Sequence, residues 1–127
     1  SDMNDVYNSF DVFLTTSTAE GWGLTLTEAI CCKLPIIFGY HTSQKEIAAP
    51  LKSGKCIELT KSVQIHDGNA IRYKLYPTEI AKWMNLFYKQ YQAGEKENFD
   101  KYDEVIKKYN WDSIAIEWSV IIAKLLK

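Results

Sequence analysis

Two glutamates flank a glycine-containing segment near the start of the chain, and the second of them would lie where it can bind a ligand that carries hydroxyl groups. Seven residues separate Glu20 from Glu28, and Gly21 and Gly23 are among them. A carboxylate one turn into a helix, as Glu28 would be, can accept hydrogen bonds from two vicinal hydroxyls, and glycine lets the backbone approach a ligand closely. The alternative for Glu28 is a capping box, because Thr25 to Glu28 fits the S/T-x-x-E pattern.

The same segment would also bind an anion. The backbone amides of Gly23, Leu24 and Thr25 would lie at a helix N-terminus, where N–H groups lack intrahelical acceptors. The positive end of the helix dipole would lie behind them, so that a diphosphate fits there. Together the anion site and Glu28 predict a ligand that contains phosphate and a sugar, whereas Glu20 taken alone is expected to be a solvated loop residue.

The surrounding residues predict the alternating strands and helices of an α/β fold. Helical segments are expected at 3–10, where Ser1 and Asp2 are candidate N-caps, and at 24–32 and 44–51. Short apolar runs favour strands at 12–15, 35–38 and 56–59. Such an order predicts a parallel sheet covered by helices on both faces, with ligands bound at the carboxyl ends of its strands.

The second half of the chain departs from this alternation. Apolar residues alternate on either side of Asp67-Gly68 and predict an inserted β-hairpin over residues 60–76. Three amphipathic segments follow within residues 77–127 and are expected to be packing helices, the last of them capped by Asp112.

Composition excludes several classes of protein. The 127 residues suit one domain, and 15 basic against 16 acidic residues leave no positive excess for nucleic acid. Arg72 is the only arginine, no apolar run could span a membrane, and no signal peptide is expected. Cys31, Cys32 and Cys56 are odd in number without a C-x-x-C pair, which argues against a disulfide framework or zinc site and favours a cytoplasmic setting.

The segment from Glu20 to Glu28, with Gly-Trp-Gly-Leu after the first acid, resembles the E-x7-E signature of retaining glycosyltransferases of family four, also called glycosyl transferases group 1. Residues 7–13 (YNSFDVF), Glu46-Ile47 and Asn110-Trp111 are similar to flanking segments of that family. The resemblance is strong over residues 7–57 and weak over 60–108.

This resemblance implies the C-terminal, nucleotide-sugar-binding half of a GT-B fold, built on a partial Rossmann-like parallel sheet. It implies that Glu20 is the catalytic-site residue that faces the donor sugar. Glu28 would bind the ribose, and amides at the helix start would bind the phosphates. The substrate-binding residues implied are Gly21, Gly23, Leu24, Thr25 and Glu28. The reaction would transfer a sugar from a nucleoside diphosphate to an acceptor hydroxyl with retention of configuration, with no cofactor and no required metal.

The family's diphosphate-binding Arg and Lys lie well upstream of its first glutamate, whereas no Lys or Arg precedes Glu20 here. We therefore expect residues 1–127 to be a truncated donor-binding domain, inactive alone. Its partner would be an acceptor-binding N-terminal domain, through which peripheral membrane contact could occur. The alternatives are a non-catalytic nucleotide-sugar-binding module, the donor-binding subunit of a split glycosyltransferase, or a purely structural flavodoxin-like domain.

One glycine position and one glycine-rich turn of the family also differ in this sequence. Lys33 replaces the glycine that ends the helix, where a left-handed residue other than glycine costs about 1 kcal/mol. The glycine-rich turn before Glu46 reads Gly39-Tyr-His-Thr-Ser43, whose amides and hydroxyls could contact the donor sugar. A polar loop role for His41 is favoured over acid–base or ligand chemistry, since no second histidine or cysteine lies nearby.

Overall fold

The computed structural model describes residues 2–51, 56–59, 62–68, 70–95 and 99–126. A three-stranded parallel sheet lies at its centre, in the order β1 (Phe13–Leu14), β2 (Ile36–Gly39), β3 (Cys56–Leu59). The register places Phe13 opposite Ile36, and Ile36 opposite Cys56. The predicted α/β class and parallel sheet are confirmed, with β1 shorter than the apolar run that predicts it.

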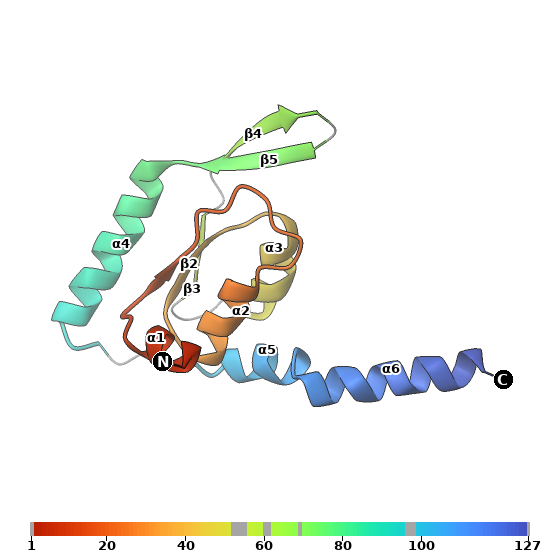
Figure 1. Cartoon of the computed structure of the whole chain (residues 1–127). Coiled ribbons are helices and arrows are strands. Elements are labelled where there is room, and N and C mark those ends of the chain that lie inside the picture. Colours follow the sequence, from red (N-terminus) through yellow and green to blue (C-terminus); the bar gives the residue numbers. More distant parts are fainter. Residues whose placement is uncertain (1, 52–55, 60–61, 69, 96–98, 127) are drawn as a thin grey trace.

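Helices flank this sheet on both sides (Figure 1). In chain order they are α1 (Met3–Asn8), α2 (Leu24–Cys31), α3 (Thr42–Ala48), the 3-10 turn η1 (Ala49–Leu51), α4 (Pro77–Gln92), α5 (Tyr102–Lys108) and α6 (Trp111–Leu125). The predicted hairpin is β4 (Ser62–Asp67) paired antiparallel with β5 (Ala70–Leu75). Its turn includes Gly68 with φ +60°, a conformation that glycine adopts without strain.

The middle strand β2 is buried on both faces, as its continuous apolar sequence requires. Ile36 and Phe38 face the larger core cluster, to which α2, α3 and α5 contribute apolar side chains. Ile37 points to the other face and packs with Phe87 of α4 and with Leu75, the last residue of the hairpin. The strand alternation therefore divides the core between the two helical layers.

Helix ends are set mostly as the sequence predicts. The Asp2 side chain caps α1 by accepting from the Asn4 amide at 3.3 Å, and Gly94 follows α4 with φ +64°. The prediction that Asp112 caps the last helix is wrong. Asn110 precedes the helix in an extended conformation, and its side-chain oxygen accepts from the Asp112 amide at 2.8 Å.

Lys33 follows Cys32, the C-cap residue of helix α2, and adopts the left-handed conformation at φ +54°. The amide of Leu34 donates to the Ala29 carbonyl at 3.1 Å, and the Lys33 amide donates to Ile30 at 2.9 Å. These two bonds define a Schellman motif, so the helix ends in the turn that favours glycine although the residue is a lysine.

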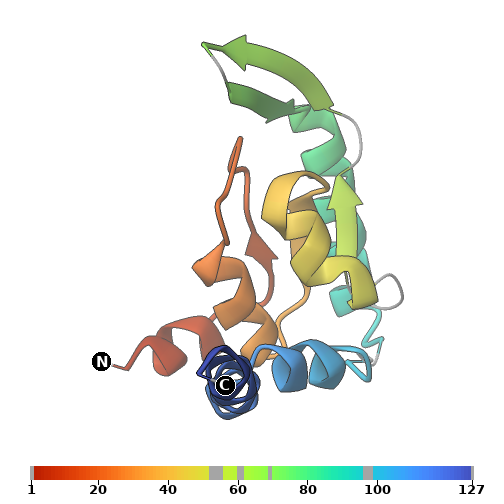
Figure 2. The same ribbon diagram turned by 90° about the vertical axis from the view of Figure 1, so that its right-hand side faces the viewer.

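The hairpin and α6 lie at opposite ends of the molecule (Figures 1 and 2). The hairpin lies beyond the carboxyl ends of the parallel strands, next to the loop that follows β1. Helix α6 projects away from the other end and buries none of its residues. Its apolar residues are exposed, Trp118 at 59% and Leu125 at 80% among them. The stripe that predicts a packing helix is therefore uncovered here.

Candidate functional site

Gly23 is the point at which the loop after β1 turns into α2. It is the N-cap residue, with φ +94° and ψ 59°, a conformation that side chains disfavour. A Cβ at this position would make only ordinary contacts, at 3.9 Å from Gln44 and Leu26. Backbone conformation therefore accounts for this glycine. Gly21 is exposed, and a Cβ there would have no heavy atom within 4 Å.

The helix start exposes two backbone amides, because α2 begins at Leu24. The amides of Leu24 and Thr25 occupy the first two helical positions, which have no intrahelical acceptor. The next amide, that of Leu26, donates to the Gly23 carbonyl at 3.0 Å. The N-cap residue makes no side-chain hydrogen bond to this end of the helix, and the positive end of the helix dipole lies behind the amides.

The capping-box alternative for Glu28 is wrong. Gly23 caps the helix, and Thr25 lies inside it, where it cannot act as an N-cap. Glu28 instead accepts a hydrogen bond at 2.7 Å from the hydroxyl of Tyr7 on α1. The carboxylate is exposed, so its second oxygen can accept hydrogen bonds from a ligand.

Tyr7 is the buried partner that fixes Glu28. Its ring is 4% exposed and packs against Phe10 and Phe13. Burial and the hydrogen bond to Glu28 raise the pKa of Tyr7 to about 12, so the hydroxyl remains a donor at neutral pH. A helical stripe predicts Tyr7 only as a packing residue, and nothing in the spacing indicates its contact with Glu28.

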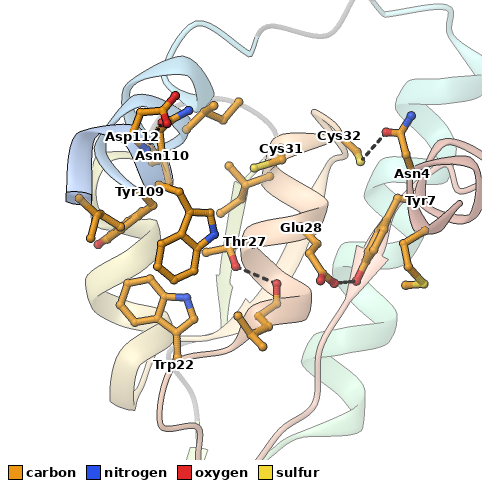
Figure 3. A pocket seen from close by; sticks show the side chains of 17 residues that line it. Asn4, Tyr7, Trp22, Thr27, Glu28, Cys31, Cys32, Tyr109, Asn110 and Asp112 are labelled. Atoms are coloured by element: carbon orange, nitrogen blue, oxygen red, sulfur yellow. Dashed lines mark hydrogen bonds between the residues drawn. The ribbon is translucent and has the colours of Figure 1, made fainter. Parts of the chain in front are cut away.

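A cavity of about 890 Å³ opens beside this pair, along the outer face of α2. Figure 3 shows Glu28 and Tyr7 pointing toward each other on one side of it, with Trp22 and Tyr109 on another. The rings of Trp22 and Tyr109 meet edge to face with centroids 4.9 Å apart. The described residues that line the cavity include Leu24 and Thr27 but no Lys or Arg. The described lining therefore offers amides and the carboxylates of Glu28 and Asp112 but no side-chain cation.

Glu20 lies outside the lining of that cavity, in the loop held against the start of α3. Its amide donates to the Thr42 hydroxyl at 3.3 Å, and its carbonyl accepts from the Ser43 hydroxyl at 3.1 Å. Ser43 also donates to the Trp22 carbonyl at 2.7 Å. The polar residues of the predicted turn thus hold the main chain of the Glu20 loop. Thr42 does so with φ +47°, a left-handed conformation that is strained for a β-branched residue.

His41, the residue before Thr42, is buried against the same loop. It is 4% exposed, and its Nε2 atom has no hydrogen-bond partner. Desolvation lowers the pKa of His41, although a hydrogen bond with the Ser17 backbone and the charge of Glu20 partly oppose this. The ring is therefore neutral at pH 7. A buried neutral ring differs from the polar loop residue that the sequence predicts.

The structure thus brings Leu24 and Glu28 to one cavity and places Glu20, Gly21, Gly23 and Thr25 on the loop and helix turn beside it. Cys31 lines the cavity as well, and burial raises the pKa of its thiol, which disfavours the nucleophilic thiolate. Within the described ranges, no group of three His, Cys, Asp or Glu side chains could hold a metal ion.

Among the helices of the described residues, none combines the length and the apolar composition that a membrane span requires.

Comparison with known protein families identifies the class of protein to which this chain belongs. Residues 1–69, more than half of the chain, match the family described as "Glycosyl transferases group 1". The chain therefore belongs to the glycosyl transferases group 1 family. No solved structure matches it significantly.

Three relatives show how much of a known protein the chain covers. It is 46% identical to the "UDP-N-acetylglucosamine–peptide N-acetylglucosaminyltransferase GtfA subunit" of Streptococcus gordonii, over 98% of this chain and 23% of that protein. The protein of the same name from Streptococcus parasanguinis is 27% identical, over 84% and 21%. A "Probable sucrose-phosphate synthase" of Thermosipho melanesiensis is 28% identical, over 97% and 25%. The chain thus spans a quarter or less of the length of these relatives.

Proposed function

We propose that this chain is the donor-binding part of a retaining GT-B glycosyltransferase of family four. It would transfer a sugar from a nucleoside diphosphate to an acceptor hydroxyl without a metal or other cofactor. The observation that carries the proposal is the exposed Glu28 carboxylate, which Tyr7 holds at 2.7 Å beside a cavity that also reaches Leu24 at the start of α2.

Each part of a nucleotide sugar has a matching group. The amides of Leu24 and Thr25 would bind the diphosphate, because they are uncapped and lie at the positive end of the helix dipole. Glu28, one turn further along, would accept hydrogen bonds from the ribose hydroxyls. Glu20 would face the donor sugar. The amides would stabilise the negative charge that develops as the diphosphate leaves.

The donor and acceptor classes follow from the names of the relatives. The Streptococcus gordonii protein is named for transfer from UDP-N-acetylglucosamine to peptide. For the protein that contains this chain we propose the same classes, UDP-N-acetylglucosamine as the donor and a peptide hydroxyl as the acceptor.

A second protein part would complete the site. A bound diphosphate needs compensating charge, and the described lining of the cavity has no Lys or Arg. The apolar residues of α6 are exposed, Trp111 at 82% beside the cavity and Leu125 at 80% further along the helix. We propose that the part of the donor-binding domain expected upstream of Glu20 supplies cations to the diphosphate, and that an acceptor-binding domain covers α6. The alternative, a donor-binding subunit of a split enzyme, is supported by the word "subunit" in the relatives' names.

Binding of uridine diphosphate to the native protein that contains this sequence tests the proposal. Glu28→Gln keeps the size of the side chain and removes the charge, so affinity should fall about tenfold while stability changes little. Asp112→Asn is the matched control, because Asp112 lines the same cavity but has no proposed ligand contact. Equal affinities for the wild type and Glu28→Gln would refute the assignment, as would an equal loss in the control.

Purification of the native protein distinguishes an acceptor-binding domain in the same polypeptide from a separate subunit of a split enzyme. One polypeptide that carries both halves supports the acceptor-binding domain, whereas a separate chain that co-purifies supports the split enzyme.

A further inference from the structure

One residue of the β4–β5 hairpin contacts both sides of the loop that carries Glu20. The amide of Tyr73 on β5 donates to the Thr18 carbonyl at 2.8 Å. Its ring stacks on His41, with centroids 4.7 Å apart and ring planes within 4° of parallel. The hairpin has no role in the proposed chemistry, so these two contacts call for an explanation.

The contact to Thr18 uses the free edge of the hairpin. Tyr73 pairs with Gln64 of β4, and within the described residues β5 has no other strand beside it. In an antiparallel pair, successive amides point alternately toward and away from the partner strand. The Tyr73 amide points away from β4 and meets the carbonyl of Thr18, two residues before Glu20. Figure 1 shows this loop passing beside the hairpin.

The contact to His41 reaches the other side of Glu20. His41 occupies the N-cap position of α3 without a side-chain capping bond, and it directly precedes Thr42 and Ser43, whose hydroxyls hold the Glu20 amide and carbonyl. The His41 ring lies so close to Gly39 that a Cβ on Gly39 would overlap it. The ring is thus confined between Gly39 and Tyr73. By fixing this ring, Tyr73 also restrains the start of α3.

We propose that Tyr73 is a positioning residue that fixes the main chain of Glu20 between the hairpin and α3. On one side, the Tyr73 amide holds Thr18, two residues before Glu20. On the other, Thr42 and Ser43 hold the main chain of Glu20, and the Tyr73 ring restrains them through His41. The inference rests on the proposed function, in which Glu20 faces the donor sugar. It predicts that the hairpin affects sugar transfer without touching the nucleotide.

The test measures kcat for sugar transfer and Kd for uridine diphosphate in the native protein. Tyr73→Ala should lower kcat about tenfold, the order expected for losing a stacked aromatic contact that orients a reacting group. Its Kd should stay within about twofold of the wild type, because Leu24, Thr25 and Glu28 all belong to α2. Tyr73→Phe keeps both the ring and the amide and should restore kcat.

Ile71→Ala is the matched control, because Ile71 lies two residues away on β5 and is 45% exposed. It should behave as the wild type. Hydrogen exchange of the Glu20 amide gives a second readout that does not depend on activity. Exchange should be faster in Tyr73→Ala and unchanged in Tyr73→Phe, because only the former loses the stack on His41.

An unchanged kcat in Tyr73→Ala would overturn the inference, as would an equal loss in Tyr73→Phe or Ile71→Ala. Unchanged exchange of the Glu20 amide in Tyr73→Ala would do the same. Failure of the proposed function looks different. In that case the wild-type protein does not bind uridine diphosphate, while exchange of the Glu20 amide still responds to Tyr73→Ala.

Discussion

The hydrogen bond from Tyr7 to Glu28 can be tested by removing one hydroxyl group. Tyr7→Phe leaves the buried ring in place, so no cavity forms, and it removes only the donor to Glu28. The carboxylate is exposed and can take up water instead, so no buried charge is left unpaired. The loss of stability therefore reports the hydrogen bond itself.

The size of this loss follows from the kind of bond. A hydrogen bond to a charged acceptor contributes about 1.5 to 3 kcal/mol, and the exposure of Glu28 places this one at the lower end. We expect Tyr7→Phe to lower the free energy of unfolding by about 1.5 kcal/mol, which is roughly 6 °C in Tm for a domain of this length. Glu28→Gln should lose less, because its amide oxygen still accepts from Tyr7.

Urea denaturation of the wild type, Tyr7→Phe, Glu28→Ala and the double variant measures the coupling between the two side chains. We expect a coupling of about 1 kcal/mol, since the two groups are in direct contact. Absorbance titration gives independent evidence. The tyrosine with a pKa of about 12 should vanish in Tyr7→Phe, and its pKa should fall in Glu28→Ala but stay raised by burial.

The sign of the pH dependence is fixed as well. The pKa of Tyr7 is raised in the folded protein, so its contribution to stability is complete below pH 10 and is lost as the pH rises toward 12. Additive losses in the double variant, or a normal titration for every tyrosine, would refute the conclusion that Tyr7 holds Glu28.

Three further predictions concern other parts of the chain. Lys33→Gly should raise the free energy of unfolding by about 1 kcal/mol in urea denaturation, because glycine suits the left-handed turn. Lys33→Ala should give no gain in stability, because alanine stays strained there and the exposed ion pair with Asp103 is lost. The pKa of His41 is lowered by burial, so folding stability should fall as the pH drops below about 6.5, and His41→Phe should weaken that dependence; equal pH profiles would contradict it. Trp118→Ser and Leu125→Ser should change the stability of this chain by less than about 0.5 kcal/mol, because both side chains are exposed, but should weaken association with an acceptor-binding domain in sedimentation experiments.

Hydrophobic periodicity was sufficient to predict most of the fold. The apolar runs of β2 and β3 lie within a residue of their predicted bounds, and the hairpin forms where Asp67-Gly68 predicts its turn. The failures are local. Asp112 and Asn110 are both residue types that cap helices well. The helix begins directly after Asn110, so Asn110 is the capping residue, and hydrophobic periodicity does not locate a helix start to within two residues.

The candidate site was predicted where it depends on local sequence and missed where it depends on contacts between distant residues. The loop and helix start near Gly23 follow from neighbouring residues. Tyr7 and Glu28, by contrast, are 21 residues apart and meet only because α1 packs beside α2. The stack of Tyr73 on His41 likewise depends on where the hairpin lies, and sequence spacing cannot give that position.

Two residues other than glycine show that the fold, and not the residue type, sets the backbone conformation at their positions. Lys33 and Thr42 both adopt left-handed conformations, with φ +54° and +47°. Such a conformation costs about 1 to 3 kcal/mol for residues other than glycine. At Lys33 the side chain offers only an exposed ion pair in return. At Thr42 the hydroxyl accepts a hydrogen bond from the Glu20 amide, a contact that glycine could not make. The strain at Thr42 is therefore coupled to the placement of Glu20, whereas the strain at Lys33 can be relieved without disturbing the site.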